Sequence, residues 1–213
     1  MVMQTGLAAL SVLATTACSV FGVESVEEAQ HRVVEQDGQF EVRVYEPMVV
    51  AETRVDADFK TAGNSAFRKL FAYISGKNTG DEEIAMTAPV VAEKQSQKQW
   101  EKIAMTAPVI ASQEAGAWLY RFVLPEGYSL QSAPRPLDPA VSLAEIPQRR
   151  VAAIRFSGRL TDSARASKSD ALKRWIDSKG LQSTSEPRWA GYNAPWALPP
   201  FRRNEVLIDI SDE

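Results

Sequence analysis

The sequence predicts an α+β fold in which antiparallel strands form a barrel or saddle and two helices pack on its outside. Two observations indicate this class. The order strand, strand, helix, strand occurs twice along the 213 residues, without the regular strand–helix alternation of a doubly wound parallel sheet. In addition, when the chain is laid on itself so that Val49 meets Val151, Leu70 meets Leu172. The chain is therefore expected to consist of two related halves with a pseudo-twofold relation.

The first half is predicted to open with a strand pair. After the turn residues Asp37-Gly38, apolar side chains alternate with more polar ones over residues 40–45, which is typical of a half-buried strand. Pro47 interrupts the pattern, and residues 49–55 are expected to be the hairpin partner of this strand.

A helix is predicted to follow this strand pair. Asp56 or Asp58 can cap its first turn, because a short side-chain oxygen accepts hydrogen bonds from the free amides there. Gly76 is expected to end it. The apolar side chains of this segment lie at helical spacing and indicate a buried stripe, comprising Phe59, Ala62, Ala66, Phe67, Leu70, Phe71 and Ile74.

Seven residues, Ile-Ala-Met-Thr-Ala-Pro-Val, occur twice without change, at residues 84–90 and 103–109. Each copy is predicted to form a strand that ends at its proline, because proline removes a donor from the strand ladder. The polar stretch between the copies is expected to form a long loop. Neither copy carries a good catalytic set, since a threonine hydroxyl without an adjacent base is a poor nucleophile. The methionines are interpreted as core-filling residues.

The second half begins after a strand over residues 118–124 and a proline-rich connector over residues 125–139. Strands are predicted at 141–146 and 150–156. A second helix is expected from Thr161 or Asp162 up to Gly180, and a closing strand at 205–210.

Composition excludes several kinds of site. The formal net charge is −3, and no basic stripe of the kind that binds phosphate backbones is apparent, so nucleic acid is not an expected partner. The chain has one Cys and one His, which rules out a zinc site built from several such residues. The lone histidine, His31, precedes the first strand pattern. Without a nucleophile–base pair, a metal cluster or a phosphate loop, the sequence predicts a protein that is not an enzyme.

The N-terminal residues indicate export. Residues 7–17 form an apolar run that is too short to span a bilayer but suits the core of a signal peptide. It ends at Ala17-Cys18-Ser19, which resembles a bacterial lipoprotein cleavage site with Cys18 as the lipidated residue. An ordinary secretory signal, or a buried helix with a structural cysteine, are the alternatives. The predicted division is a signal peptide (1–17), a polar leader (18–36) and one barrel domain (37–213), located in a bacterial cell envelope, lipid-anchored or periplasmic.

Several segments in order along residues 30–211 resemble one family. They are the opening strand 40–45, the first helix and its exit (67–78), the repeated heptads, and residues 122–125, 191–196 and 202–206. Together they resemble the SOUL haem-binding family. The resemblance implies a distorted eight-stranded antiparallel β-barrel with two long helices, which agrees with the pattern of strands and helices above.

The resemblance also implies non-covalent, non-enzymatic binding of haem or another tetrapyrrole in a shallow apolar groove beside the first helix. In one branch of the family an axial His precedes the Tyr of the opening strand, but Val44 stands there, so no axial His is expected. In another branch basic residues face the propionates. Asn64, Ala72 and Leu198 occupy those positions, which leaves Lys60, Arg68 and Lys69 on the first helix as substitutes.

The expected groove lies between one edge of the helix stripe and an aromatic, proline-rich loop over residues 187–201. Another flat hydrophobic ligand is an alternative, because the duplicated architecture also resembles multidrug-sensing regulator domains. A ligand-free envelope or interaction scaffold is a further alternative, in which the loop only plugs the barrel. The predicted binding residues are Lys60, Asn64, Phe67, Arg68, Phe71, Trp196 and Leu198.

Overall fold

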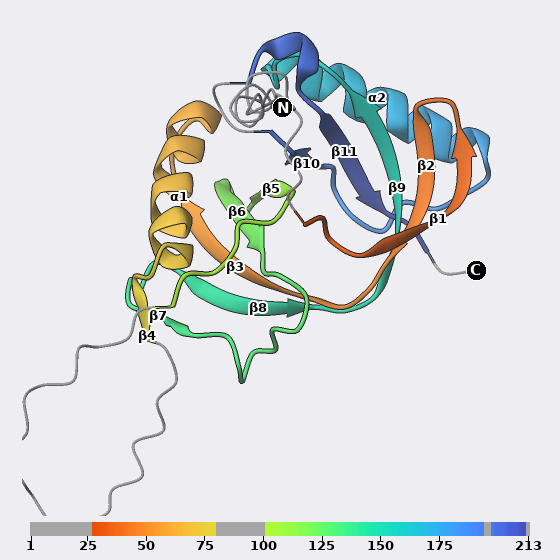
Figure 1. The fold of residues 1–213 in the computed structure, drawn as a ribbon. Coiled ribbons are helices and arrows are strands. Elements are labelled where there is room, and N and C mark those ends of the chain that lie inside the picture. The colour runs from red at the N-terminus through yellow and green to blue at the C-terminus, as the bar shows by residue number, and fades with distance from the viewer. Residues whose placement is uncertain (1–26, 80–100, 194–196, 212–213) are drawn as a thin grey trace, which may run out of the picture.

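Nine strands form one curled antiparallel sheet with two long helices packed against it (Figure 1). The computed structural model describes residues 27–79, 101–193 and 197–211. Within these residues the sheet order is β1-β2-β9-β11-β10-β5-β6-β3-β8, and β4 pairs with β7 in a separate two-stranded sheet. The elements are β1 (His31–Asp37), β2 (Phe40–Tyr45), β3 (Met48–Val55), α1 (Phe59–Ile74), β4 (Asn78–Thr79), β5 (Val109–Glu114), β6 (Ala117–Val123), β7 (Arg135–Pro136), β8 (Ser142–Ile146), β9 (Arg149–Phe156), α2 (Asp162–Ser178), β10 (Arg188–Gly191), η1 (Pro199–Phe201) and β11 (Asn204–Asp209).

The predicted α+β class is confirmed, although the main sheet has nine strands in the described residues where eight were expected. Three of these strands were not predicted. All but the last residue of β1 lie within the segment assigned to a polar leader, β5 begins at the last residue of the predicted strand 103–109, and β10 lies within the predicted aromatic loop. β1 is an edge strand with mostly exposed side chains, so its backbone bonds to β2 form without any apolar alternation in the sequence.

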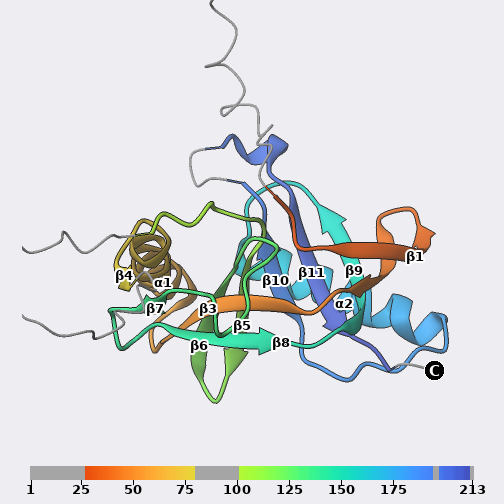
Figure 2. The same cartoon turned by 60° about the horizontal axis from the view of Figure 1, so that its bottom comes forward.

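The expected hairpin of residues 40–45 with 49–55 is wrong. β2 pairs with β1 and β9 near one end of the strand order, whereas β3 pairs with β6 and β8 near the other end. The two strands are joined by Glu46-Pro47, which lacks the glycine or asparagine that a tight two-residue hairpin turn favours. The chain instead passes from one part of the curled sheet to the other (Figure 2).

The prediction that the second heptad, residues 103–109, forms a strand is also wrong for most of its length. Residues 103–106 have no strand pairing, Ala107 makes an isolated bridge to Glu28, and β5 begins at Val109 after a cis Ala107-Pro108 bond. The heptad is fixed by other contacts: Ile103 N donates to Ile74 O at 2.8 Å, and the Thr106 hydroxyl donates to Val123 O. Met105 packs against the core, as expected of a filler residue. The first copy, at 84–90, lies outside the described residues.

Both helices begin and end where the sequence indicates. The Asp58 side chain accepts from Lys60 N and Thr61 N, both at 3.1 Å, and Thr161 caps α2 by accepting from Ala164 N at 3.2 Å. After α1, Gly76 adopts a φ of 110°, a backbone conformation that L side chains rarely adopt. No helix in the described ranges is long and apolar enough to cross a bilayer.

Three buried clusters follow from the alternation of side chains along the strands. α1 packs on β3 and β6, and α2 packs on β9 and β11, which leaves the opposite, interior face of the sheet with a cluster of its own. Leu70 of α1 and Leu172 of α2, which the internal match aligns, are both completely buried between their helix and the sheet. Val49, however, faces α1 while Val151 faces the interior, so the match is one residue out of register in the strands.

Candidate functional site

The candidate site is the exposed side of α1. Lys60, Asn64 and Arg68 follow one another at four-residue spacing and are solvent-exposed, while Ala62, Ala66 and Leu70 on the other side are completely buried. The helix therefore presents a polar and basic stripe to solvent and an apolar one to the sheet. Phe67 lies at the boundary between the two stripes and is half-buried.

A hollow on this side of α1 is lined by Gly63, Asn64, Phe67 and Arg68. Its volume is about 590 Å³, and ligand sites commonly measure roughly 300–1,000 Å³. Three of the seven predicted binding residues thus border one concavity, and Lys60 and Phe71 lie on the same helix. Sequence reasoning missed Gly63, although a glycine inside a helical pattern is a recognised signal of close packing.

Gly63 lets α1 approach β6 closely. A Cβ at this position would lie 3.1 Å from the Tyr120 hydroxyl, which donates a hydrogen bond to Phe59 O at 3.0 Å. Gly63 also borders the hollow, to which it contributes backbone atoms only.

Three phenylalanine rings connect the core to the surface beside this hollow. The Phe67 ring meets Phe122 of β6 edge-on, with centroids 5.5 Å apart. On its other side it stacks against Phe71, with centroids 5.7 Å apart and the planes 10° from parallel. Phe122 is buried, whereas Phe71 is 46% exposed. As the apolar stripe predicts, one edge of it emerges from under the sheet, and there it offers a flat apolar ring to solvent.

The basic side chains of the stripe are available to an anionic group. Within the described part of the chain, neither Lys60 nor Arg68 forms an ion pair with another residue. By contrast, Arg203 and Glu205 pair within the fold, with Arg203 Nε donating to Glu205 Oε1 at 3.0 Å.

Where the structure describes the aromatic loop, none of its residues lines this hollow. Leu198 is 45% exposed, immediately before η1, and is not among the residues that line the hollow. Tyr192 points into the interior cluster and Trp189 lies on the helix-covered face. Trp196, the remaining predicted binding residue, lies outside the described residues.

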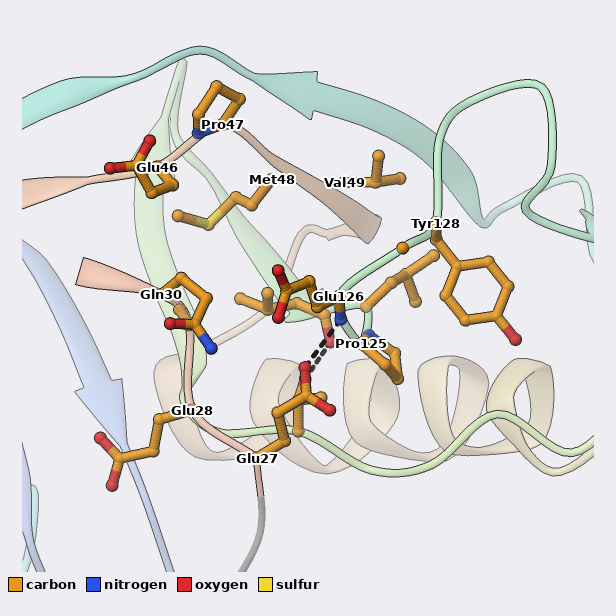
Figure 3. Close-up of a pocket in the computed structure, with 15 residues that line it drawn as sticks. Glu27, Glu28, Gln30, Glu46, Pro47, Met48, Val49, Pro125, Glu126 and Tyr128 are labelled. Carbon is orange, nitrogen blue, oxygen red and sulfur yellow. Dashed lines mark hydrogen bonds between the residues drawn. The ribbon is translucent and has the colours of Figure 1, made fainter.

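A second pocket has the wrong charge and size for a tetrapyrrole. It lies between the N-terminal described residues, the β2–β3 connection and the segment after β6 (Figure 3). Its volume is about 210 Å³, and its walls, as far as the described residues form them, include Glu27, Glu28, Glu46 and Glu126 but no lysine or arginine. Glu27 Oε1 accepts from Glu126 N at 2.7 Å, which closes one side of the pocket. Glu28 pairs with Arg203, and the other three carboxylates would repel the propionates of a haem.

Comparison with known proteins identifies the family. A family model described as SOUL heme-binding protein matches residues 26–101 and 93–209. The chain belongs to the SOUL haem-binding family. Human Heme-binding protein 2 is 41% identical over 58 residues, a match that covers 27% of this chain and only 28% of that protein.

Solved structures show a similar fold at low identity. The C-terminal domain of EcmrR superposes with a TM-score of 0.57 at 11% identity, covering 82% of this chain and 98% of that one. A hydrolase from Listeria innocua gives 0.53 at 10% identity, covering 84% and 94%. At these identities the likeness concerns the arrangement of strands and helices alone.

The position at which the SOUL resemblance would place an axial histidine lies inside the fold. Val44 is 8% exposed on β2. The single histidine, His31, lies on β1. Its ring contacts Tyr45 at a tilt of 34° with centroids 4.9 Å apart, and its Nδ1 lies 2.9 Å from Ala29 O. β1 is at one edge of the sheet, far in strand order from β3 and β6 that carry α1. In the part of the chain that the structure describes, no three His, Cys, Asp or Glu side chains are grouped to hold a metal ion.

Proposed function

We propose that this SOUL-family chain binds haem or a related tetrapyrrole non-covalently on the exposed side of α1, without an axial histidine. The observation that carries the proposal is the Phe122–Phe67–Phe71 series, which ends in an exposed ring next to the hollow. A flat macrocycle can lie against Phe71 and the half-buried Phe67, and bury apolar surface on both sides of the contact.

The polar groups around the hollow suit the rim of such a ligand. Lys60 and Arg68 can face the propionates, and Asn64 can donate a hydrogen bond from its amide. Exposed ion pairs of this kind contribute about 0–1 kcal/mol each. Most of the affinity must then come from apolar burial, at about 25 cal/mol per Å² of apolar surface removed from water.

The proposal is one of binding rather than catalysis. The side chains that line the hollow supply an amide, a phenyl ring and a guanidinium, and Gly63 supplies backbone alone. None of these is a nucleophile or a proton donor suited to reaction near neutral pH.

Titration with haemin, followed by the Soret band, tests the proposal. Phe71→Asp should weaken haemin binding by about tenfold, because it removes roughly half of a phenylalanine's burial and adds a charge like that of the propionates. Val33→Asp is the matched control: Val33 is exposed to the same 46% but lies on β1. Circular dichroism should show that both variants are folded.

Unchanged haemin affinity in folded Phe71→Asp would contradict the proposed site. A loss of affinity in Leu198→Asp but not in Phe71→Asp would move the site to the loop before η1. Saturable binding of another planar apolar dye, with no response to haemin, would favour the alternative of a different flat ligand.

We also propose that Cys18 is lipidated and holds the chain at a bacterial cell envelope. The support is in the sequence, where the apolar run 7–17 leads to Ala17-Cys18-Ser19. These residues lie outside the described ones. One acyl chain binds membranes only marginally, so a stable anchor would need more than one.

A further inference from the structure

Arg165 on α2 is a buried arginine surrounded by aromatic rings. It is 8% exposed, and its guanidinium carbon lies 3.7 Å from the centre of the Phe59 ring, 5.0 Å from Trp118 and 5.1 Å from Trp189. All three distances are within the roughly 6 Å over which a cation is attracted to the face of a ring. The three rings are called the aromatic box below.

The aromatic box lies between the two helices. Phe59 is the first residue of α1, Trp118 is in β6 and Trp189 is in β10, so the box joins both halves of the fold. β10, β5 and β6 are adjacent in the sheet and lie between α1 and α2 (Figure 1). The rings also support one another: Phe59 meets Trp118 at 4.9 Å, and Trp118 meets Trp189 at 5.7 Å. The walls are therefore held in place by contacts among themselves as well as by Arg165.

Arg165 is incompletely paired in this position. One ion pair, from Nη2 to Asp162 Oδ1 at 2.5 Å, involves a carboxylate whose side chain is 90% exposed. Within the described part of the chain, Arg165 Nε, Ser169 Oγ and Trp189 Nε1 are buried and have no hydrogen-bond partner. Arg165 also lies near the start of α2, where the helix dipole disfavours positive charge. The aromatic faces and Asp162 are thus the contacts that hold this cation.

From these contacts we infer that the aromatic box is an organic-cation site whose resting occupant is Arg165. A weakly hydrated cation, such as a quaternary ammonium group, enters by displacing the guanidinium, which then extends into solvent from the first turns of α2. Asp162 remains beside the box as a counter-charge, and the free Trp189 and Ser169 donors can bind a polar group on the same ligand. This function is separate from tetrapyrrole binding, since it uses a different site and the opposite charge.

The first test removes the occupant. Tetramethylammonium chloride is titrated into Arg165→Ala and wild-type protein, with tryptophan fluorescence and calorimetry as readouts and sodium chloride as the ionic-strength control. Arg165→Ala should bind about tenfold more tightly or better, because the internal competitor is gone. Lys168→Ala, which removes a cation from the same helix outside the box, should behave as wild type. Adding Trp189→Leu to Arg165→Ala should abolish the gain.

A folded Arg165→Ala protein without saturable tetramethylammonium binding would overturn the inference, as would equal affinity in wild type. A second measurement covers the case in which Arg165→Ala does not fold. In wild type, the NMR signal of Arg165 Nε–Hε, assigned with Arg165→Lys, should move from its ring-shifted position towards that of a solvated arginine as tetramethylammonium is added. If the signal stays in place up to the solubility limit of tetramethylammonium chloride, Arg165 is a fixed structural group.

Discussion

Replacement of Glu205 by leucine is expected to destabilise the fold strongly. Glu205 is completely buried on the interior face of the sheet. It accepts hydrogen bonds from Arg43 Nη1 at 2.7 Å, Arg43 Nη2 at 3.0 Å and the Tyr192 hydroxyl at 2.7 Å, and it also pairs with Arg203. Glu205→Leu leaves Arg43, which is 2% exposed, without the carboxylate that its two terminal nitrogens share.

The contacts that Arg43 and Arg203 keep in Glu205→Leu set the expected loss of unfolding free energy. Removing one partner of a buried ion pair typically costs about 3–5 kcal/mol. After the change, Arg43 Nε still reaches Glu41 Oε2 at 2.6 Å, and Arg203 Nη1 still reaches Glu28 Oε1 at 2.8 Å. The expected loss is therefore about 3 kcal/mol, at the low end of that range. It is a large part of the roughly 5–15 kcal/mol by which a domain is stable.

Urea unfolding followed by circular dichroism measures this loss. Glu114→Leu is the control, because Glu114 pairs with Arg54 at the surface, with 40% and 55% of the two side chains exposed, and should lose only about 0–1 kcal/mol. Adding Arg43→Met to Glu205→Leu should recover most of the stability, since no buried charge is then left alone. A loss below about 1 kcal/mol in Glu205→Leu would refute the view that the cluster depends on this carboxylate.

The same carboxylate predicts a pH dependence. Burial alone would raise the pKa of Glu205, but the hydrogen bonds and charges of Arg43, with that of Arg203, hold the pKa below its usual value. A lowered pKa in the folded state means that the contribution to stability is complete above the unfolded pKa and is lost as pH falls through the folded pKa. Wild type should therefore lose more stability than Glu205→Leu on acidification from pH 7 to below the ordinary glutamate pKa of 4.5.

Two further predictions concern haem coordination and the N-terminal segment. His31→Ala should leave the visible spectrum of bound haem unchanged, because His31 lies on β1 and not on α1; loss of a low-spin histidine spectrum in this variant would contradict that placement. In a bacterial expression host, wild-type protein should partition into the detergent phase of a Triton X-114 extract. Cys18→Ala should move to the aqueous phase. If mass spectrometry shows that wild-type protein from this host still carries residues 1–17, that result would count against export.

The local elements of the fold could be predicted because their causes lie within a few residues. The caps Asp58 and Thr161, the buried stripe of α1 and the alternation in β2 and β9 depend on neighbours at most four positions away. The sequence also indicated which residues lie together on the candidate site. Asn64, Phe67, Arg68 and Phe71 share one helix, whose 3.6-residue period fixes which side chains are neighbours.

The tertiary structure alone decided which segments meet. Glu46-Pro47 disfavours a tight hairpin between β2 and β3, but nothing local selects β9 as the partner of β2, because a strand offers the same backbone donors and acceptors to any partner. β1 is held by backbone bonds to β2 and by polar contacts at the end of α2, such as Lys179 Nζ to Glu35 Oε1, so its mostly exposed side chains concealed it in the sequence. Leu198 was placed in the predicted groove on the assumption that its loop lies against α1. In the structure Leu198 is not among the residues that line the hollow.

The charged residues show the same division most clearly. Arg43 and Glu205 are 162 positions apart, and Arg165 meets rings from three other elements, yet each looks like an ordinary surface charge in the sequence. A charge is buried only where the fold supplies a counter-charge or aromatic faces, and those come from distant segments. The sequence by itself determined the helices, most strands and which side chains of α1 lie together at its surface. Only the folded chain determined the buried ion cluster and the aromatic box, because their energies depend on contacts that exist after folding.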